Sequence, residues 1–166
     1  MLKDKSRIYD LTNVELHWAK LDPENPVKPF EDVQWEAQIH TTDKAVADEW
    51  TKNYLTVKER DGVYVAQLKR NAFKKDGTTP NTPVSVVGRR LEPVNPNTIG
   101  NGSIANLKVY QFNYPQNGGG VGSRLSGVQI IDLKEYTPNT SGGFEALDAP
   151  SDEEFAVVED STAPMF

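Results

Sequence analysis

Residues 103–114, SIANLKVYQFNY, alternate between two kinds of side chain. Ala105, Leu107 and Val109 supply an apolar series on one side. The other side carries a cation and three aromatic residues, namely Lys108, Tyr110, Phe112 and Tyr114. Because successive side chains of a strand point to opposite faces, this period of two predicts a strand with one face on a hydrophobic core. The opposite face then presents the aromatic rings and the lysine.

Five further segments have the composition or alternation of strands: residues 14–18, 33–40, 63–70, 84–91 and 124–133. The alternation in the first two places Trp18 and Trp35 on the apolar side, so we expect both to be core residues. One helix is predicted over residues 43–53, where Val46, Trp50 and Tyr54 recur at the spacing of an apolar helix face. We expect this face to pack the helix on the sheet.

The segments between the predicted strands are rich in glycine and proline, as in KKDGTTPNTP, EPVNPNTIGNG and PQNGGGVG, and are typical of turns. The sequence therefore predicts a mainly β protein, with five to six antiparallel strands in an OB-fold barrel and one short helix. The domain is expected over residues 1–137. Residues 138–166 lack hydrophobic periodicity and are expected to form a flexible, disordered acidic tail.

The composition weighs against several classes of function. The chain has no cysteine and two histidines, which argues against thiolate chemistry, a histidine-based metal site and a catalytic triad. Its acidic residues are scattered and form no pair on a core strand, so we expect no metal, no cofactor and no enzymatic activity. No apolar run is long enough to span a bilayer and the first residues do not resemble a signal peptide, so we expect a cytoplasmic protein.

The charges are divided between the predicted barrel and the predicted tail. The formal net charge is −6, yet residues 142–166 contain seven acids and no base. Residues 58–124 contain ten bases against four acids. A basic middle followed by an acidic end is compatible with a polyanionic partner that binds the barrel.

Exposed aromatic rings beside cations are the side chains that bind single-stranded nucleic acid, since the rings stack on unpaired bases and the cations neutralise phosphates. Tyr110, Phe112, Tyr114 and Lys108 are therefore candidate contacts. In the alternative interpretation, the second side of the strand is also buried and Phe112 fills a further apolar layer.

The segment KRNAFKKDG, residues 69–77, places cations around an aromatic residue at the end of a strand. We expect a projecting loop that contacts nucleic acid through Lys69, Arg70, Phe73, Lys74 and Lys75, the alternative being a solvated hairpin with the ring tucked under it. Arg89 and Arg90 add two cations, of which strand alternation allows one to reach the same groove. The glycine run before Arg124 opens a strand and not a helix, so it is a loop between strands and not a phosphate-binding loop. Arg124 is a further candidate contact with phosphate.

In NGSIANLKVYQFNY, followed after a glycine loop by GSRLSGVQIIDL, the chain resembles the single-stranded DNA-binding proteins of tailed bacteriophages. The end, SDEEFAVVEDSTAPMF, resembles the acidic tails of such proteins. The resemblance implies an OB-fold that coats and protects single-stranded DNA in phage DNA replication, recombination and repair, in the cytoplasm of the infected bacterial cell. It also implies that the tail recruits phage or host DNA polymerase and helicase–primase, a role that falls on Asp152, Glu153, Glu154, Glu159, Asp160 and Phe166. A homodimer with exchanged tails is compatible with the resemblance.

Two other classes of function remain compatible with the sequence. In the first, the chain is a non-catalytic phage β-sandwich that acts as a structural or protein-interaction module, with residues 69–77 contacting a protein. In the second, which is weaker because the acidic residues are scattered, it is a metal-dependent nuclease or another nucleotide enzyme. Binding to single-stranded and duplex oligonucleotides, together with a test for strand cleavage on addition of magnesium, distinguishes the three classes.

Overall fold

The computed structural model describes residues 2–28 and 32–136. It divides the chain into two units, Met1–Tyr136 and Thr137–Phe166, and the predicted tail lies outside the described residues. The strands of the first unit are β1 (Ser6–Lys20), β2 (Gln34–Thr41), β3 (Val57–Arg60), β4 (Val63–Asn71), β5 (Ser85–Val87), β6 (Ser103–Tyr114) and β7 (Gly120–Asp132). One α-helix, α1 (Lys44–Lys52), and two 3-10 turns, η1 (Pro96–Thr98) and η2 (Gln116–Gly118), complete the described elements.

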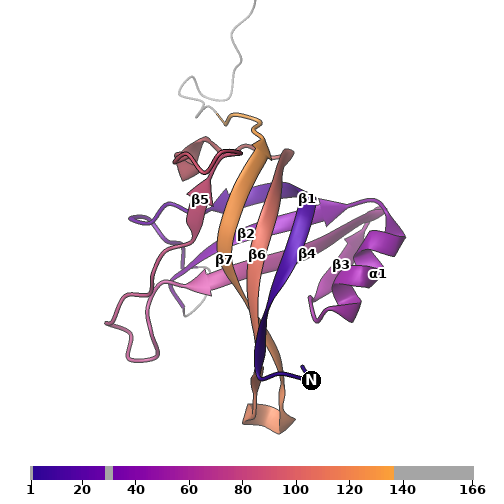
Figure 1. The fold of residues 1–166 in the computed structure, drawn as a ribbon, viewed down its shortest axis with the longest axis vertical. Helices are drawn as coiled ribbons and strands as arrows, with labels where there is room; N and C mark the ends of the chain where they lie inside the picture. Colours follow the sequence, from indigo (N-terminus) through magenta and orange to yellow (C-terminus); the bar gives the residue numbers. More distant parts are fainter. Residues whose placement is uncertain (1, 29–31, 137–166) are drawn as a thin grey trace, which may run out of the picture. The chain divides into compact units, whose positions relative to one another are not determined.

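The strands form one sheet in the order β3-β4-β2-β1-β6-β7-β5. Neighbouring strands are antiparallel except for the short β5, which pairs in parallel with β7. Although β4 and β7 are not neighbours in this order, they contact each other, so the sheet curls as in a barrel. Figure 1 shows β2 and β4 crossing behind the long strands β6 and β7. The predicted mainly β, OB-like class with one helix is confirmed.

The sheet has seven strands where the sequence predicted five or six. The additional strand is β3, whose sequence VKER contains three charged residues and no apolar alternation. It forms because it pairs with β4 at the end of the sheet, from Val57 opposite Ala66 to Arg60 opposite Val63. A strand that is held by backbone pairing alone needs no alternation of apolar and polar residues. The residue pattern of β3 therefore did not predict a strand.

The hydrophobic core lies between the strands and α1. The alternation of β6 correctly predicted which residues of that strand belong to the core. Ala105, Leu107 and Val109 are each at most 1% exposed. Trp35 on β2 is also buried, as predicted, and its indole Nε1 donates a hydrogen bond to the Asp22 carbonyl at 2.7 Å. The outward side of β6 is thereby left for the aromatic residues.

The prediction that Trp18 belongs to the core is wrong. Its side chain is 57% exposed and its backbone has φ of 51°, a left-handed conformation that bulky residues rarely adopt. The pairing of β1 with β2 shifts between His17 and Lys20, so the alternation that holds through Leu16 is lost. A bulge turns the side chains that follow it to the other face, which is why the indole faces solvent.

The prediction of one apolar helix face through Val46, Trp50 and Tyr54 is also wrong in part. Trp50 and Ala47 are buried, whereas Val46 and Tyr54 are exposed. The helix begins after Asp43, whose carboxylate accepts a hydrogen bond from the Ala45 amide at 2.9 Å, and it ends at Lys52. Tyr54 therefore lies beyond the helix, so helical spacing does not apply to it. In the described part of the chain, α1 is too short and too polar to cross a membrane.

Candidate nucleic-acid interface

The outward side of β6 and β7 brings together four of the predicted contacts, Tyr110, Phe112, Tyr114 and Arg124, with Lys108 beside them. We call these five residues the β6–β7 face. The ring centroids of Tyr110 and Phe112 lie 5.7 Å apart at an interplanar angle of 22°. The Arg124 guanidinium carbon lies 4.9 Å from the Phe112 centroid and 5.8 Å from the Tyr110 centroid. Two rings and one cation therefore form a single compact group.

Glycines of β7 explain how the aromatic rings lie on this face. In the β6–β7 ladder Phe112 is opposite Gly122, and Tyr114 is opposite Gly120. A Cβ atom at Gly122 would lie 2.5 Å from Phe112 Cζ, and one at Gly120 would lie 2.5 Å from Tyr114 Oη. The rings thus occupy the space above glycine backbone, a packing that any other residue would obstruct. The glycine run predicted to be a loop is a strand from Gly120 onward for this reason.

The aromatic residues of β6 are half-buried and none belongs to the hydrophobic core. Phe112 is therefore not the centre of a second apolar layer. Ile8 of β1 pairs with Tyr110 in the neighbouring ladder and is 53% exposed. This isoleucine extends the apolar part of the face; it was not predicted because β1 begins at Ser6, before the strand expected over residues 14–18.

Arg70, at the end of β4, lies near Arg124. Partial burial, followed by the positive charge of Arg124, lowers the pKa of Arg70 from its usual value. The Arg70 Nε donates a hydrogen bond to the Thr82 carbonyl at 2.5 Å, which holds the side chain in place. Guanidinium groups remain charged in proteins, so two neighbouring arginines form a site attractive to phosphate. Lys69 is opposite Glu36 on β2 and is exposed.

The segment after β4, where the sequence predicted a projecting loop, forms a hairpin in which Phe73 bridges to Pro80; Lys74 and Lys75 are exposed and Phe73 is 37% exposed. The carboxylate of Asp76 holds its tip by accepting hydrogen bonds from the Thr78 and Thr79 amides at 2.9 and 2.8 Å and from the Thr79 hydroxyl. These bonds lower the pKa of Asp76 to about 2. The tip thus stays braced at any pH well above that value.

Arg89 and Arg90 do not alternate on a strand as predicted, because β5 ends at Val87 and both residues lie in the turn that follows. Both side chains are exposed. The Leu91 amide donates to the Gly88 carbonyl at 3.0 Å, and the Glu92 carboxylate accepts from the Arg90 amide at 2.8 Å. The backbone hydrogen bonds to Glu92 lower its pKa. A turn, unlike a strand, presents both arginines on the surface.

Most of the candidate cations are free of acidic partners within residues 2–28 and 32–136. Four ion pairs form there, and Lys108, which lies 2.5 Å from Asp10 Oδ1, is the one candidate that takes part in any of them. The cations without a carboxylate partner in this part of the chain are Lys69, Arg70, Lys74, Lys75, Arg89, Arg90 and Arg124. Their charge is thus available to an anionic ligand.

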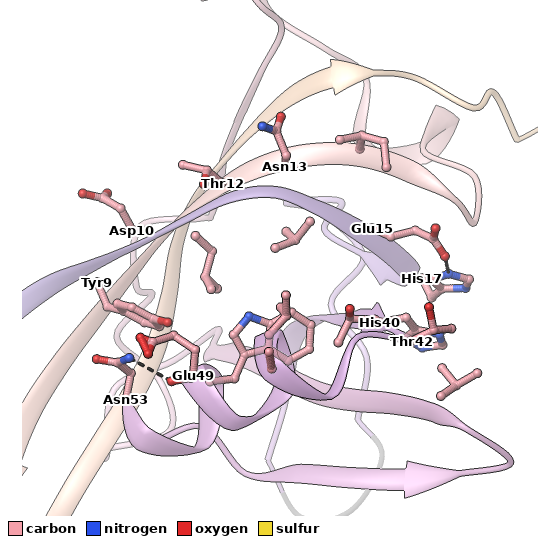
Figure 2. A pocket seen from close by; sticks show the side chains of 18 residues that line it. Tyr9, Asp10, Thr12, Asn13, Glu15, His17, His40, Thr42, Glu49 and Asn53 are labelled. Atoms are coloured by element: carbon pink, nitrogen blue, oxygen red, sulfur yellow. Dashed lines mark hydrogen bonds and ion pairs between the residues drawn. The ribbon is translucent and has the colours of Figure 1, made fainter.

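A cavity of about 980 Å³ lies away from these cations, between β1 and α1. Figure 2 shows Tyr9, Glu49 and Asn53 at one end of it and Glu15, His17 and His40 at the other. The two imidazoles stack with centroids 3.7 Å apart, and Glu15 lies 2.7 Å from His17 Nε2. Burial, followed by the neighbouring His17, lowers the pKa of His40. The carboxylates make this cavity a poor site for phosphate.

The described residues contain no group of three or more His, Asp or Glu side chains placed to hold a metal ion. The stacked histidines come from β1 and β2, which are consecutive strands, but their contact depends on the register between the two strands and so was not predicted. Nor was it predicted that Arg70 would lie close enough to Arg124 for the charge of Arg124 to lower its pKa. Opposed glycines and aromatics in a hairpin are a signal that could have revealed the strand at Gly120.

No protein-family model and no curated protein matches the sequence. Among solved structures, gp2.5, a single-stranded DNA-binding protein encoded by bacteriophage T7, is 15% identical, with a TM-score of 0.51 over 86% of this chain and 100% of that chain. A C-terminal truncation of the single-stranded DNA-binding protein from bacteriophage Enc34 is 16% identical, with a TM-score of 0.52 over 81% of this chain and 94% of that chain. The Enc34 protein in complex with single-stranded DNA is 15% identical, with a TM-score of 0.52 over 77% and 88%. The chain therefore has the fold of these bacteriophage single-stranded DNA-binding proteins.

Proposed function

We propose that this chain is a non-catalytic protein that binds single-stranded DNA on the β6–β7 face. The observation that carries the proposal is the stacked pair of Tyr110 and Phe112 with the Arg124 guanidinium over both rings. Rings of this kind stack on bases of any sequence, and each stacked base contributes about 1 to 3 kcal/mol. A similar fold in a protein solved in complex with single-stranded DNA supports the same ligand.

The geometry favours a single strand over a duplex. Stacking on Tyr110 and Phe112 requires bases whose flat faces are free, and a duplex buries those faces. Beyond Arg124, which lies over the rings, the exposed cations of the Phe73 hairpin and of the Arg89–Arg90 turn are further candidate contacts for a flexible phosphate backbone. Because phosphate contacts release counterions, binding is expected to weaken steeply with salt.

Fluorescence anisotropy with labelled oligo-dT, in parallel with a duplex of the same length, tests the proposal. We expect tight binding to the single strand that weakens as salt is raised, and no comparable binding to the duplex. Binding to neither would favour the protein-interaction module over a nucleic-acid function. Cleavage of the oligonucleotide on addition of magnesium would contradict the absence of catalysis.

We further propose that the protein coats and protects single-stranded DNA during phage replication, recombination and repair in the host cytoplasm, and that the acidic segment recruits partners. The acids Asp152, Glu153, Glu154, Glu159 and Asp160, with Phe166, would contact a DNA polymerase or helicase–primase. This part of the proposal rests on the sequence, since these residues lie outside those that the structure describes. Association of two copies through the same segment is compatible with it.

Deleting residues 138–166 tests the role of the acidic segment. The deletion changes the formal net charge from −6 to +1, so we expect affinity for oligo-dT at low salt to rise, because repulsion of the phosphates falls. Association with purified phage or host DNA polymerase, followed by sedimentation, should be lost. A deletion that leaves both affinity and association unchanged would contradict a role in either.

A further inference from the structure

A second cavity, of about 570 Å³, adjoins the β6–β7 face on the outward side of β5, β6 and β7. Its lining includes the apolar Val87 and Leu91, the amides of Asn106 and Gln129, Gly127, and the ion pair that Lys108 forms with Asp10. We call it the Leu91 pocket. In the β6–β7 ladder Lys108 is opposite Gly127. Tyr110, the next residue of β6 on the same side, is opposite Arg124. The pocket therefore continues the surface on which we place the DNA.

Folding does not account for the leucine at position 91. Its side chain is 71% exposed, and its backbone has φ of 66°, where a leucine is strained. An asparagine or glycine would suit that backbone better, and a polar side chain would suit that exposure better. An apolar side chain held at such a position is the kind of outlier that indicates a role in binding.

The turn that carries Leu91 is braced. The Gly88 amide donates to the Glu92 carbonyl at 2.8 Å, and a Cβ atom at Gly88 would collide with the Glu92 carboxylate. The Gln129 Nε2 of β7 donates to the Arg89 carbonyl at 3.2 Å and so attaches the turn to the sheet. Leu91 is thus held at the rim of the pocket by specific contacts.

The two amides in the pocket keep part of their hydrogen-bonding capacity. Asn106 Oδ1 accepts from the Asn13 amide at 2.9 Å, and Asn106 Nδ2 donates to Gln129 Oε1 at 3.2 Å. Each carboxamide has two donor hydrogens and an oxygen with two lone pairs. One hydrogen and one lone pair of each amide remain outside these bonds, and together they match the adjacent donors and acceptors on the edge of a nucleobase.

We infer that the Leu91 pocket receives one unstacked nucleobase of the bound strand. Leu91 and Val87 pack against the flat face of the base, while Asn106 and Gln129 meet its edge and Arg89 and Arg90 lie near the adjoining phosphates. The cavity volume falls within the range of about 300 to 1,000 Å³ that is usual for small-molecule sites. This inference rests on the proposed function. The β6–β7 face stacks on any base, whereas the Leu91 pocket would be a subsite that distinguishes one base from another.

Two substitutions test the pocket without removing any residue of the β6–β7 face. In Gly127→Leu the new Cβ meets its nearest atoms, on Lys108 and Ser85, at 3.8 to 3.9 Å, so the first carbon is accommodated and the rest of the side chain fills the cavity. In Leu91→Asn the strained backbone receives a residue that tolerates it, while the apolar contact is lost. Leu133→Ala is the matched control, because Leu133 is an exposed leucine that does not line the pocket.

The readouts are anisotropy with oligo-dT, oligo-dC and oligo-dA of equal length, and the thermal unfolding midpoint of each variant. We expect Gly127→Leu and Leu91→Asn each to weaken binding of the preferred oligonucleotide about five- to tenfold, somewhat less than the contribution of one fully buried apolar side chain. The differences among the three oligonucleotides should shrink in both variants. Leu133→Ala should bind as the wild type does, and Leu91→Asn should unfold at the same or a higher temperature.

A second measurement covers the case in which Gly127→Leu is poorly folded. In ¹⁵N–¹H spectra of the full chain, the side-chain NH₂ signals of Asn106 and Gln129 should shift when oligo-dT is added. If the wild type binds oligo-dT but these signals stay in place and Leu91→Asn binds equally well, the pocket inference is wrong and the proposed function stands. If the wild type binds no single strand, both are wrong. Weaker binding by Leu91→Asn with no effect of a well-folded Gly127→Leu would also overturn the pocket.

Discussion

Replacing Tyr110 and Phe112 together with alanine is expected to lower the affinity for oligo-dT by at least about 30-fold. Each ring that stacks on a base contributes about 1 to 3 kcal/mol, so the loss of two should cost about 2 to 6 kcal/mol. The rings lie outside the core, so the fold should persist. Anisotropy measured at one fixed salt concentration gives the change in affinity, and circular dichroism checks the fold.

Tyr136→Ala is the matched control for this double substitution. Tyr136 is 55% exposed and does not belong to the β6–β7 face, so its loss should leave affinity unchanged. The salt dependence provides a further check, because removing rings should leave its slope as it is, whereas Arg124→Ala should reduce the slope. Wild-type affinity in the double variant would show that the strand binds elsewhere on the protein.

Trp50→Ala is expected to lower the free energy of unfolding by about 3 to 5 kcal/mol, the usual cost of removing a buried aromatic side chain. Trp50 is 3% exposed and is the largest side chain that α1 contributes to the core. Since a domain of this size is stable by about 5 to 15 kcal/mol, the substitution should remove a large share of the stability. Guanidinium chloride denaturation followed by circular dichroism measures the change.

Val46→Ala is the control for the helix. Val46 was predicted to share the buried face with Trp50, but it is 37% exposed, so its truncation should cost well under about 1 kcal/mol. A cost similar to that of Trp50→Ala would mean that Val46 is buried in solution and that the helix packs as the spacing of its residues first indicated.

Strand prediction from the sequence succeeded wherever a strand has one apolar and one polar face. β6 and β2 alternate without interruption, and their inward residues are buried as predicted. Prediction failed at Trp18, because a bulge reverses the alternation and no local pattern marks it. It failed at β3 because pairing with β4 requires backbone groups and no particular side chains.

For the candidate site, the sequence indicated residue types and not their arrangement. Aromatic and cationic residues on β6 were recognisable from their period, and Phe73, Lys74 and Lys75 from their position in a turn. Arg89 and Arg90 were assigned to a strand because three valines precede them, although Gly88, which directly follows Val87, is a residue type that often ends a strand. The Leu91 pocket could not be predicted, since its amides come from β6 and β7 and its rim from the turn after β5.

The sequence by itself determined the two faces of β6, because a period of two is a property of the extended backbone and requires no partner. It also determined the separation of charge between a basic middle and an acidic end. Only the tertiary structure decided which groups meet. Register places Phe112 over Gly122, barrel curvature brings Arg70 near Arg124, and pairing of β5 with β7 sets Leu91 beside Asn106 and Gln129. Contacts between different segments depend on strand order and register. The pattern of residues within one segment carries no information about either.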